Sequence, residues 1–390
     1  MRRMAQWCAL LGVGAVTIAA AGCGGHDSPS SSSSGNVFIG IEGTLSGAEP
    51  VPAFTDGAVD YLKMANSTNL VPHIKFTYKV ADTANNGAQA LTVTRDFIQA
   101  DGADAIISFG SVPIDALKAA ASSLKVPIIA SGDGDLFVSS ATNMYTAVPS
   151  YLAMWHYAMQ LVPSHFHDST ASLVYQDDSF GQPASAAANQ FASSSGITVS
   201  TQVPVPDTTT SDFTPFAARL KASGAKIVIA ALAPELLAGV EAAANQLGYN
   251  PIWLTNWGAE ETSVLTAIGA ASARTYAVDF LPPIDTTKTS AMNAYKSGVS
   301  SADLNNEFAE QGWNEAAVLV KAVDSLVAAH QSVSPTSLQN AMLKVSGSIG
   351  TMTNFSYTSS KHYGVNDMAL LAYKNGDFVQ ITPFVSLPAS

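Results

Sequence analysis

The sequence is poor in cysteine and in charge. Only two of its 390 residues are cysteines, Cys8 and Cys23, and both lie near the N-terminus. This excludes a disulfide framework, a cysteine-rich zinc site and an iron–sulfur cluster. Charged residues make up 12% of the chain and hydrophobic residues 47%, which is a globular composition and not a disordered one. Because the chain is too long for one compact core, we expect two domains.

Basic residues are fewer than acidic residues. There are 18 Lys and Arg against 30 Asp and Glu, which gives a formal net charge of −12. Such a surface repels phosphate backbones, and no basic patch with interleaved aromatic residues is present, so nucleic-acid binding is not expected. The cluster formed by His165, His167 and Asp168 falls in a polar loop, and we expect neither a metal nor a cofactor.

No apolar run in the first part of the chain is long enough to span a bilayer. Arg2 and Arg3 are followed by an apolar run from Leu10 to Ala21, whereas a membrane-spanning helix needs about 20 apolar residues. The run has the length of a signal-peptide core, so residues 1–22 are predicted to direct export by the general route.

Small residues precede the second cysteine, in the order Ala20, Ala21, Gly22 and Cys23. This pattern resembles the lipobox of bacterial lipoproteins. The resemblance implies that Cys23 becomes the first mature residue and carries the lipid that holds the protein at a membrane, facing the periplasm or the cell surface. The alternative is an ordinary signal peptide with a chance cysteine. Residues 23–36, with the run GGHDSPSSSSSG, predict a flexible tether.

The rest of the chain alternates between short apolar strands and helices, which predicts parallel sheets covered on both faces. The expected strands are 37–42, 73–82, 104–110, 126–131, 171–178, 197–205, 225–233 and 251–257, with an extended segment at 275–283. The expected helices are 55–65, 88–99, 114–124, 151–161, 183–194, 213–222, 235–247, 307–329 and 335–345. Asn375-Gly376, between apolar runs, predicts a final hairpin. Two wound sheets with a helical return suggest lobes that exchange segments.

Ligands of open α/β sheets bind beyond the carboxyl ends of the strands. This rule selects a small set of candidate ligand-binding residues: Ser46, Ser111, Asp133, Asp135, Phe180, Leu232, Asn256 and Trp257. Pro113 places Ser111 at a helix N-terminus, where free backbone amides favour an anion. Five of the candidates also have a structural explanation. Trp257 and Phe180 suit a core, Ser111 suits a helix cap, and the two aspartates suit a glycine-rich turn.

Several segments occur in the order found in the type I periplasmic binding proteins. They are IGIEGTLSG at 39–47, TRDFIQADGADAIISFGS at 94–111, VPIIASGDGD at 126–135, SLVYQDDSFGQ at 172–182, DFTPFAARLKASGAKIVI at 212–229 and EQGWNEAAVLVKAV at 310–323. The chain resembles the leucine/isoleucine/valine-binding branch of that family, the substrate-binding lipoproteins of ABC importers. The resemblance implies an α/β fold of two doubly wound parallel-sheet lobes joined by three crossovers. Lobe 1 would hold residues 37–149 and 282–350, and lobe 2 would hold residues 150–281 and 351–390.

The resemblance also implies roles for the candidate residues. Ser111 falls near the serine that holds a ligand carboxylate, Asp133 and Asp135 fall where ligand polar groups are held, and Phe180 takes the place of a tyrosine that closes over the ligand. Asn256 and Trp257 stand where an acidic residue often pairs with an ammonium group. Phe180 lacks the tyrosine hydroxyl, and Trp257 forms no salt bridge. A ligand with an apolar or aromatic part, or an amide or amine, therefore fits better than a simple branched-chain amino acid.

Three functions follow from these observations. The first is capture of a small-molecule solute for an ABC permease, by a protein expected to be a monomer without a cofactor. The second is presentation of the same ligand to a membrane sensor. The third is an exported hydrolase. The sequence lacks the G-x-S-x-G and H-E-x-x-H motifs of such enzymes, and none of the seven histidines falls at a predicted strand end of the cleft.

Overall fold

The structure is a computed structural model that describes residues 35–47, 50–132, 141–206, 211–260, 269, 274–374 and 377–388. The predicted signal peptide, Cys23, most of the tether, Asp133 and Asp135 lie outside these residues. Gly35 and Asn36, predicted as the end of the tether, instead begin the first strand. None of the helices that the structure describes has the length and apolar character needed to cross a membrane.

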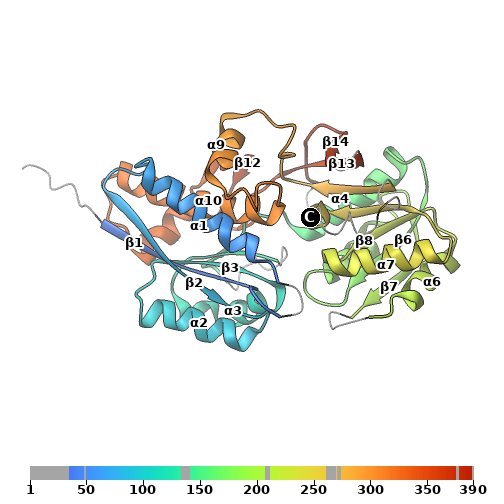
Figure 1. The fold of residues 1–390 in the computed structure, drawn as a ribbon, viewed down its shortest axis with the longest axis horizontal. Coiled ribbons are helices and arrows are strands. Elements are labelled where there is room, and N and C mark those ends of the chain that lie inside the picture. Colours follow the sequence, from blue (N-terminus) through green and yellow to red (C-terminus); the bar gives the residue numbers. More distant parts are fainter. Residues whose placement is uncertain are drawn as a thin grey trace, which may run out of the picture. The chain divides into compact units, whose positions relative to one another are not determined.

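The first sheet is entirely parallel, with the strand order β2-β1-β3-β4-β5. Its strands are β1 (Gly35–Gly43), β2 (Ile74–Asp82), β3 (Ala105–Phe109), β4 (Ile128–Ser131) and β5 (Met144–Tyr145). The helices that accompany it are α1 (Pro52–Ser67), α2 (Gly87–Gln99), α3 (Ser111–Leu124) and α10 (Glu307–Ala328). Both faces of the sheet are apolar. Ile106 and Ile128 pack with α2 and α3, whereas Ile107 and Ile129 pack with α1 and α10 on the opposite face (Figure 1).

The second sheet is mixed, with the order β14-β13-β10-β9-β8-β6-β7. Its strands are β6 (Thr170–Gln176), β7 (Thr198–Val205), β8 (Ile227–Ala231), β9 (Ile252–Asn256), β10 (Thr275–Asp279), β13 (Asp367–Lys374) and β14 (Asp377–Gln380), and β15 (Val385–Ser386) pairs with β13. Its helices are α4 (Tyr151–Ser164), α5 (Gln182–Phe191), α6 (Thr214–Ser223) and α7 (Pro234–Gln246). Strands β6 to β10 are parallel, and β13 runs antiparallel to β10.

The C-terminal part of the chain contributes to both sheets. Helix α10 packs along α1, whereas β13 and β14 extend the second sheet. Between them lie α11 (Pro335–Met342) and the two-stranded sheet of β11 (Ser346–Ile349) and β12 (Met352–Ser356). Trp313 of α10 is buried between the rings of Tyr61 and Tyr295, with centroid distances of 4.9 and 5.5 Å.

The predicted fold class is confirmed, because the described chain forms two wound α/β sheets of the type expected. The hairpin is present as well, with Lys374 paired to Asp377, although the turn residues 375–376 lie outside the described part. Helix α9 (Ser290–Gly298), β5 and the β11–β12 pair were not predicted. These elements are short, with nine residues or fewer each.

Helix α10 carries two carboxyl groups into the interior. Glu310 accepts a hydrogen bond from Thr351, and Glu315 accepts hydrogen bonds from Ser131 of β4 and from Gln311. Both glutamates are fully buried. Burial raises the pKa of Glu315 to about 8, against the smaller lowering effect of its hydrogen bonds.

This burial predicts that the free energy of unfolding falls as the pH rises. Below pH 4.5, the ordinary pKa of a glutamate, Glu315 holds its proton in both the folded and the unfolded chain. Between that pH and about 8, unfolding releases the proton, so this group lowers stability by roughly 1.4 kcal/mol per pH unit. Above pH 8 its contribution is constant. Urea unfolding of Glu315→Gln at pH 5 and pH 8 should therefore show a smaller difference than the wild type.

The matched control for this experiment is Asp324→Asn, which changes an exposed carboxylate on the same helix. It should keep the wild-type difference between the two pH values. An unchanged pH dependence in Glu315→Gln would show that Glu315 does not take up a proton in the folded chain at neutral pH.

Candidate ligand-binding site

A pocket opens at the carboxyl ends of strands from both sheets and has an empty volume of about 680 Å³, the solvent at its mouth included. The residues that line it are Thr44, Val51, Asn85, Phe109, Gly110, Ser111, Gly132, Tyr151, Gln176, Phe180, Ala233, Pro234, Glu235, Asn256, Trp257, Gly258 and Phe308. This is the position at which parallel α/β sheets bind ligands.

The strand ends bring the lining residues together. In the first sheet, Thr44 follows β1, Gly110 follows β3 and Gly132 follows β4. Gly110 and Gly132 have φ values of +117° and +123°, and a Cβ atom on Gly132 would lie 3.1 Å from the Gly110 backbone. Only glycine allows two strand ends to turn so close to each other. In the second sheet, Gln176 ends β6 and Asn256 ends β9.

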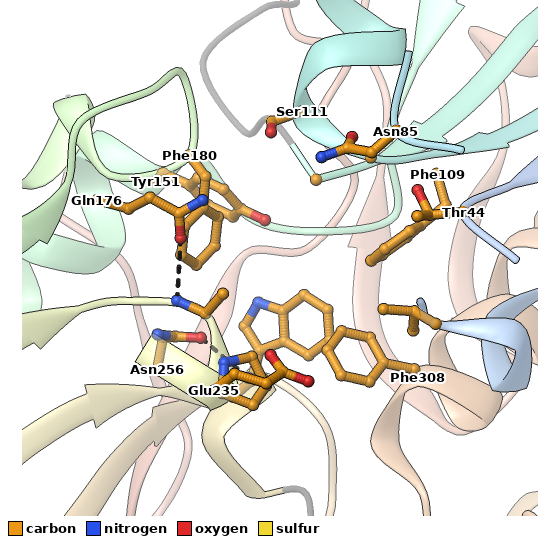
Figure 2. A pocket seen from close by; sticks show the side chains of 17 residues that line it. Thr44, Asn85, Phe109, Ser111, Tyr151, Gln176, Phe180, Glu235, Asn256 and Phe308 are labelled. Carbon is orange, nitrogen blue, oxygen red and sulfur yellow. Dashed lines mark hydrogen bonds between the residues drawn. The ribbon is translucent and has the colours of Figure 1, made fainter. Parts of the chain in front are cut away.

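Aromatic side chains form most of the wall. Phe109 of β3 and Trp257 both contact Phe308 of α10 edge-on, at centroid distances of 5.6 and 5.3 Å. Figure 2 shows Phe109 and Phe308 on one side of the pocket and Tyr151 and Phe180 on the other. Tyr151 and Phe180 contact each other edge-on at 5.6 Å. Five rings from separate segments thus enclose a mainly apolar space.

Two polar side chains of the wall are held by neighbouring backbone. The amide oxygen of Gln176 accepts from Ala233 N at 3.2 Å, and that of Asn256 accepts from Gly258 N at 3.0 Å (Figure 2). The Asn256 amide nitrogen donates to the carbonyl oxygen of Leu232. Among the buried atoms of the pocket lining, the indole Nε1 of Trp257 and the Oδ1 of Asn85 have no hydrogen-bond partner in the described part of the chain.

A hydrogen bond joins the two sides of the pocket. Ser111, the first residue of α3, donates from Oγ to Oδ2 of Asp178 at 3.0 Å. Oδ1 of Asp178 accepts from the backbone nitrogens of Phe180 and Gly181. The carboxylate of Asp178 therefore orders the loop that carries Phe180. It also accepts the one hydrogen bond that the Ser111 hydroxyl can donate.

Charge is scarce at the pocket. Among the lining residues that the structure describes, Glu235 is the only one with a charged side chain, and it is exposed in the first turn of α7. No lysine, arginine or histidine belongs to that described lining. Across residues 35–47, 50–132, 141–206, 211–260, 269, 274–374 and 377–388, moreover, no group of three histidine, cysteine, aspartate or glutamate side chains could hold a metal ion.

A family model described as "Periplasmic binding protein" matches residues 36–377. The chain belongs to the periplasmic binding protein family. The resemblance drawn from the sequence is thereby confirmed. Membership indicates that this binding protein is exported and binds a small-molecule ligand.

Solved structures share the fold of this binding protein. A branched-chain amino acid ABC transporter protein from Thermus thermophilus with bound valine has a TM-score of 0.80 at 18% identity, covering 90% of this chain and 97% of the other. A substrate-binding protein from Aeropyrum pernix has a TM-score of 0.80 at 19% identity, covering 91% and 96%. A Rhodopseudomonas palustris solute-binding protein in complex with 4-hydroxybenzoate has a TM-score of 0.79 at 15% identity, covering 90% of this chain and 98% of the other. A search of the curated proteins gave no match.

The pocket brings together four of the predicted site residues: Ser111, Phe180, Asn256 and Trp257. Two others lie elsewhere. Ser46 donates its hydroxyl to Asp82 at the surface, and the side chain of Leu232 is buried in the core of the second sheet. Asp133 and Asp135 lie outside the described residues. A role in binding stays a prediction for all eight.

The other lining residues were not among the candidates, and they include Asn85, Phe109, Tyr151, Gln176 and Phe308. Phe109 and Gln176 are the last residues of β3 and β6, whereas the predicted strands extended to residues 110 and 178. A search that included the final strand residues would have found both only with the strand ends placed where the structure has them. Phe308 comes from a helix far along the chain, and no local signal in the sequence indicates its position.

Proposed function

We propose that this protein captures a small organic solute with an aromatic or apolar part and delivers it to an ABC permease. The observation that carries the proposal is the set of five aromatic side chains around a pocket with few polar groups. Aromatic rings recognise a flat apolar ligand through its area and its ring edges. Proteins of this fold are known with valine and with 4-hydroxybenzoate, and the aromatic wall favours a ligand of the second kind in size and shape.

We further propose that the pocket closes by movement of two lobes. Lobe 1 would hold residues 37–149 and 282–350, and lobe 2 residues 150–281 and 351–390. The packing of α10 on α1 and the pairing of β13 with β10 support this division. Solute contacts made from both lobes at once favour the closed form, which is the form that a permease would recognise.

Mass spectrometry of solute released from the purified protein tests the proposed ligand class directly. The expected result is a small aromatic or apolar compound. Thermal shifts with a panel that contains aromatic compounds, leucine and valine provide the second measurement, and the aromatic compounds should raise the melting temperature most. Tight binding of leucine or valine, with no response to any aromatic compound, would contradict the proposal.

We also propose that the protein is anchored to the membrane by lipid attached to Cys23. In cells that express Cys23→Ser, the protein should move from the membrane fraction to the soluble exported fraction, because the acyl chains supply the membrane affinity. Cell fractionation with immunoblotting measures this, and Cys8→Ser is the matched control. Retention of Cys23→Ser in the membrane fraction would show that the anchor lies elsewhere.

A further inference from the structure

The wall of the pocket holds a buried hydrogen-bond donor without a partner. Trp257 is 2% exposed and lines the pocket, and its indole Nε1 donates to no atom of the described chain. An indole nitrogen is a donor only, and buried donors in proteins are almost always paired. The missing partner is therefore a hydrogen-bond acceptor, and the pocket is the space from which it can come.

A buried acceptor without a partner lies on another part of the wall. Asn85, in the loop between β2 and α2, has its Oδ1 unpaired among the described residues. Figure 2 shows its side-chain amide beside Ser111, on the side of the pocket supplied by the first sheet. This oxygen calls for a hydrogen-bond donor. The two sides of the pocket can therefore pair with different ligand groups. Trp257 can donate to an acceptor, and Asn85 can accept from a donor.

The charges around the pocket disfavour a carboxylate. The one serine expected to hold a carboxylate, Ser111, already donates its hydroxyl to Asp178. Glu235 is the sole charged member of the described lining. An anionic ligand would meet one carboxylate and no basic side chain of those residues, and a charge that leaves water without a counter-charge is strongly disfavoured.

We propose that the pocket selects an uncharged aromatic compound whose amide-like group offers an acceptor to Trp257 Nε1 and a donor to Asn85 Oδ1. This inference rests on the proposed function and specifies its ligand class. Trp257 and Asn85 are the residues that determine specificity, and the aromatic side chains hold the ring. An amide offers both an acceptor and a donor in one neutral group, whereas a carboxylate lacks the donor and an ammonium lacks the acceptor.

Three probes with the same ring separate these possibilities: benzamide, benzoate and benzylamine. Isothermal calorimetry of the full-length chain without its lipid (Cys23→Ser) should give benzamide an affinity at least about tenfold higher than that of either charged probe. Benzoate or benzylamine binding as tightly as benzamide would overturn the inference and leave the proposed aromatic ligand class intact. Failure of all three to bind, together with a released solute that has no ring, would overturn the proposed function and the inference with it.

Two variants test the assigned residues. Trp257→Phe keeps a ring in the wall and removes the donor, so it should weaken benzamide about tenfold and leave the weaker binding of toluene unchanged. Asn85→Leu should weaken benzamide in the same way. The control is Trp253→Phe, which changes another buried indole of the second sheet that does not line the pocket. Equal benzamide affinity in Trp257→Phe and the wild type would overturn the assignment of Trp257. A melting temperature near that of the wild type shows that a variant is folded.

Discussion

Gly312→Ala should destabilise the fold strongly, although alanine is the better helix former. A Cβ atom on Gly312 would lie 1.9 Å from the carbonyl oxygen of Phe54 in α1, and one on Gly57 would lie 1.9 Å from that of Ala309 in α10. The two helices therefore cross with their backbones in contact. In an exposed helix the exchange of glycine for alanine gains about 1 kcal/mol. Here each new methyl group meets backbone, which cannot rotate away.

The expected cost exceeds that gain. To admit the methyl group, α1 and α10 must separate, and Trp313 then loses close packing against Tyr61 of α1. Overpacking of a core costs about 1–3 kcal/mol where side chains can adjust, and more where backbone must move. We expect Gly57→Ala and Gly312→Ala each to lower the free energy of unfolding by about 3 kcal/mol or more.

Urea unfolding measures this effect, and Gly35→Ala is the matched control. A Cβ atom on Gly35 would lie 3.6 Å from Ile74, which is an ordinary contact. That variant should differ from the wild type by less than about 0.5 kcal/mol. Wild-type stability in Gly312→Ala would mean that the two helices cross at a greater distance than the structure shows.

The sheets were predictable from the sequence because their strands are buried on both faces. The strand Ala105–Phe109 is buried throughout and is apolar except for Ser108, and helices with a 3.6-residue period stand on either side of it. The crossing of α1 and α10 was not predictable. Gly57 and Gly312 are more than 250 positions apart, and a glycine inside a helix indicates close packing without naming the partner.

Only the site residues that lie at the ends of strands could be predicted from the sequence. Ser111 and Trp257 follow strands directly, and the structure places both in the pocket lining. Ser46 was selected by the same rule, yet its hydroxyl bonds to Asp82 and the lining residue of that turn is Thr44. The direction of a side chain two or three residues past a strand depends on the loop, which periodicity does not determine. Phe308 shows the second limit, because tertiary packing alone brings it to the wall.

Phe180→Ala should cause the largest loss of solute affinity with the smallest effect on folding. Phe180 is half-buried, lines the pocket and contacts Tyr151, so its ring is available to a ligand without being part of the central core. Burial of an aromatic side chain against a ligand contributes about 1.5–3 kcal/mol, and a ring–ring contact adds about 0.5–1.5 kcal/mol. Their sum corresponds to a loss of affinity of roughly 30- to 2000-fold.

Calorimetric titration with the solute released from the purified protein measures this loss, and Phe180→Tyr is the informative companion. The tyrosine keeps the ring and should retain most of the affinity. Phe216→Ala removes another half-buried ring of the second sheet, away from the pocket, and should bind like the wild type. An affinity of Phe180→Ala within about threefold of the wild type would mean that the loop after β6 does not cover the solute, since a buried ring contributes far more than that. The aromatic wall would then act through Phe109, Trp257 and Phe308 alone.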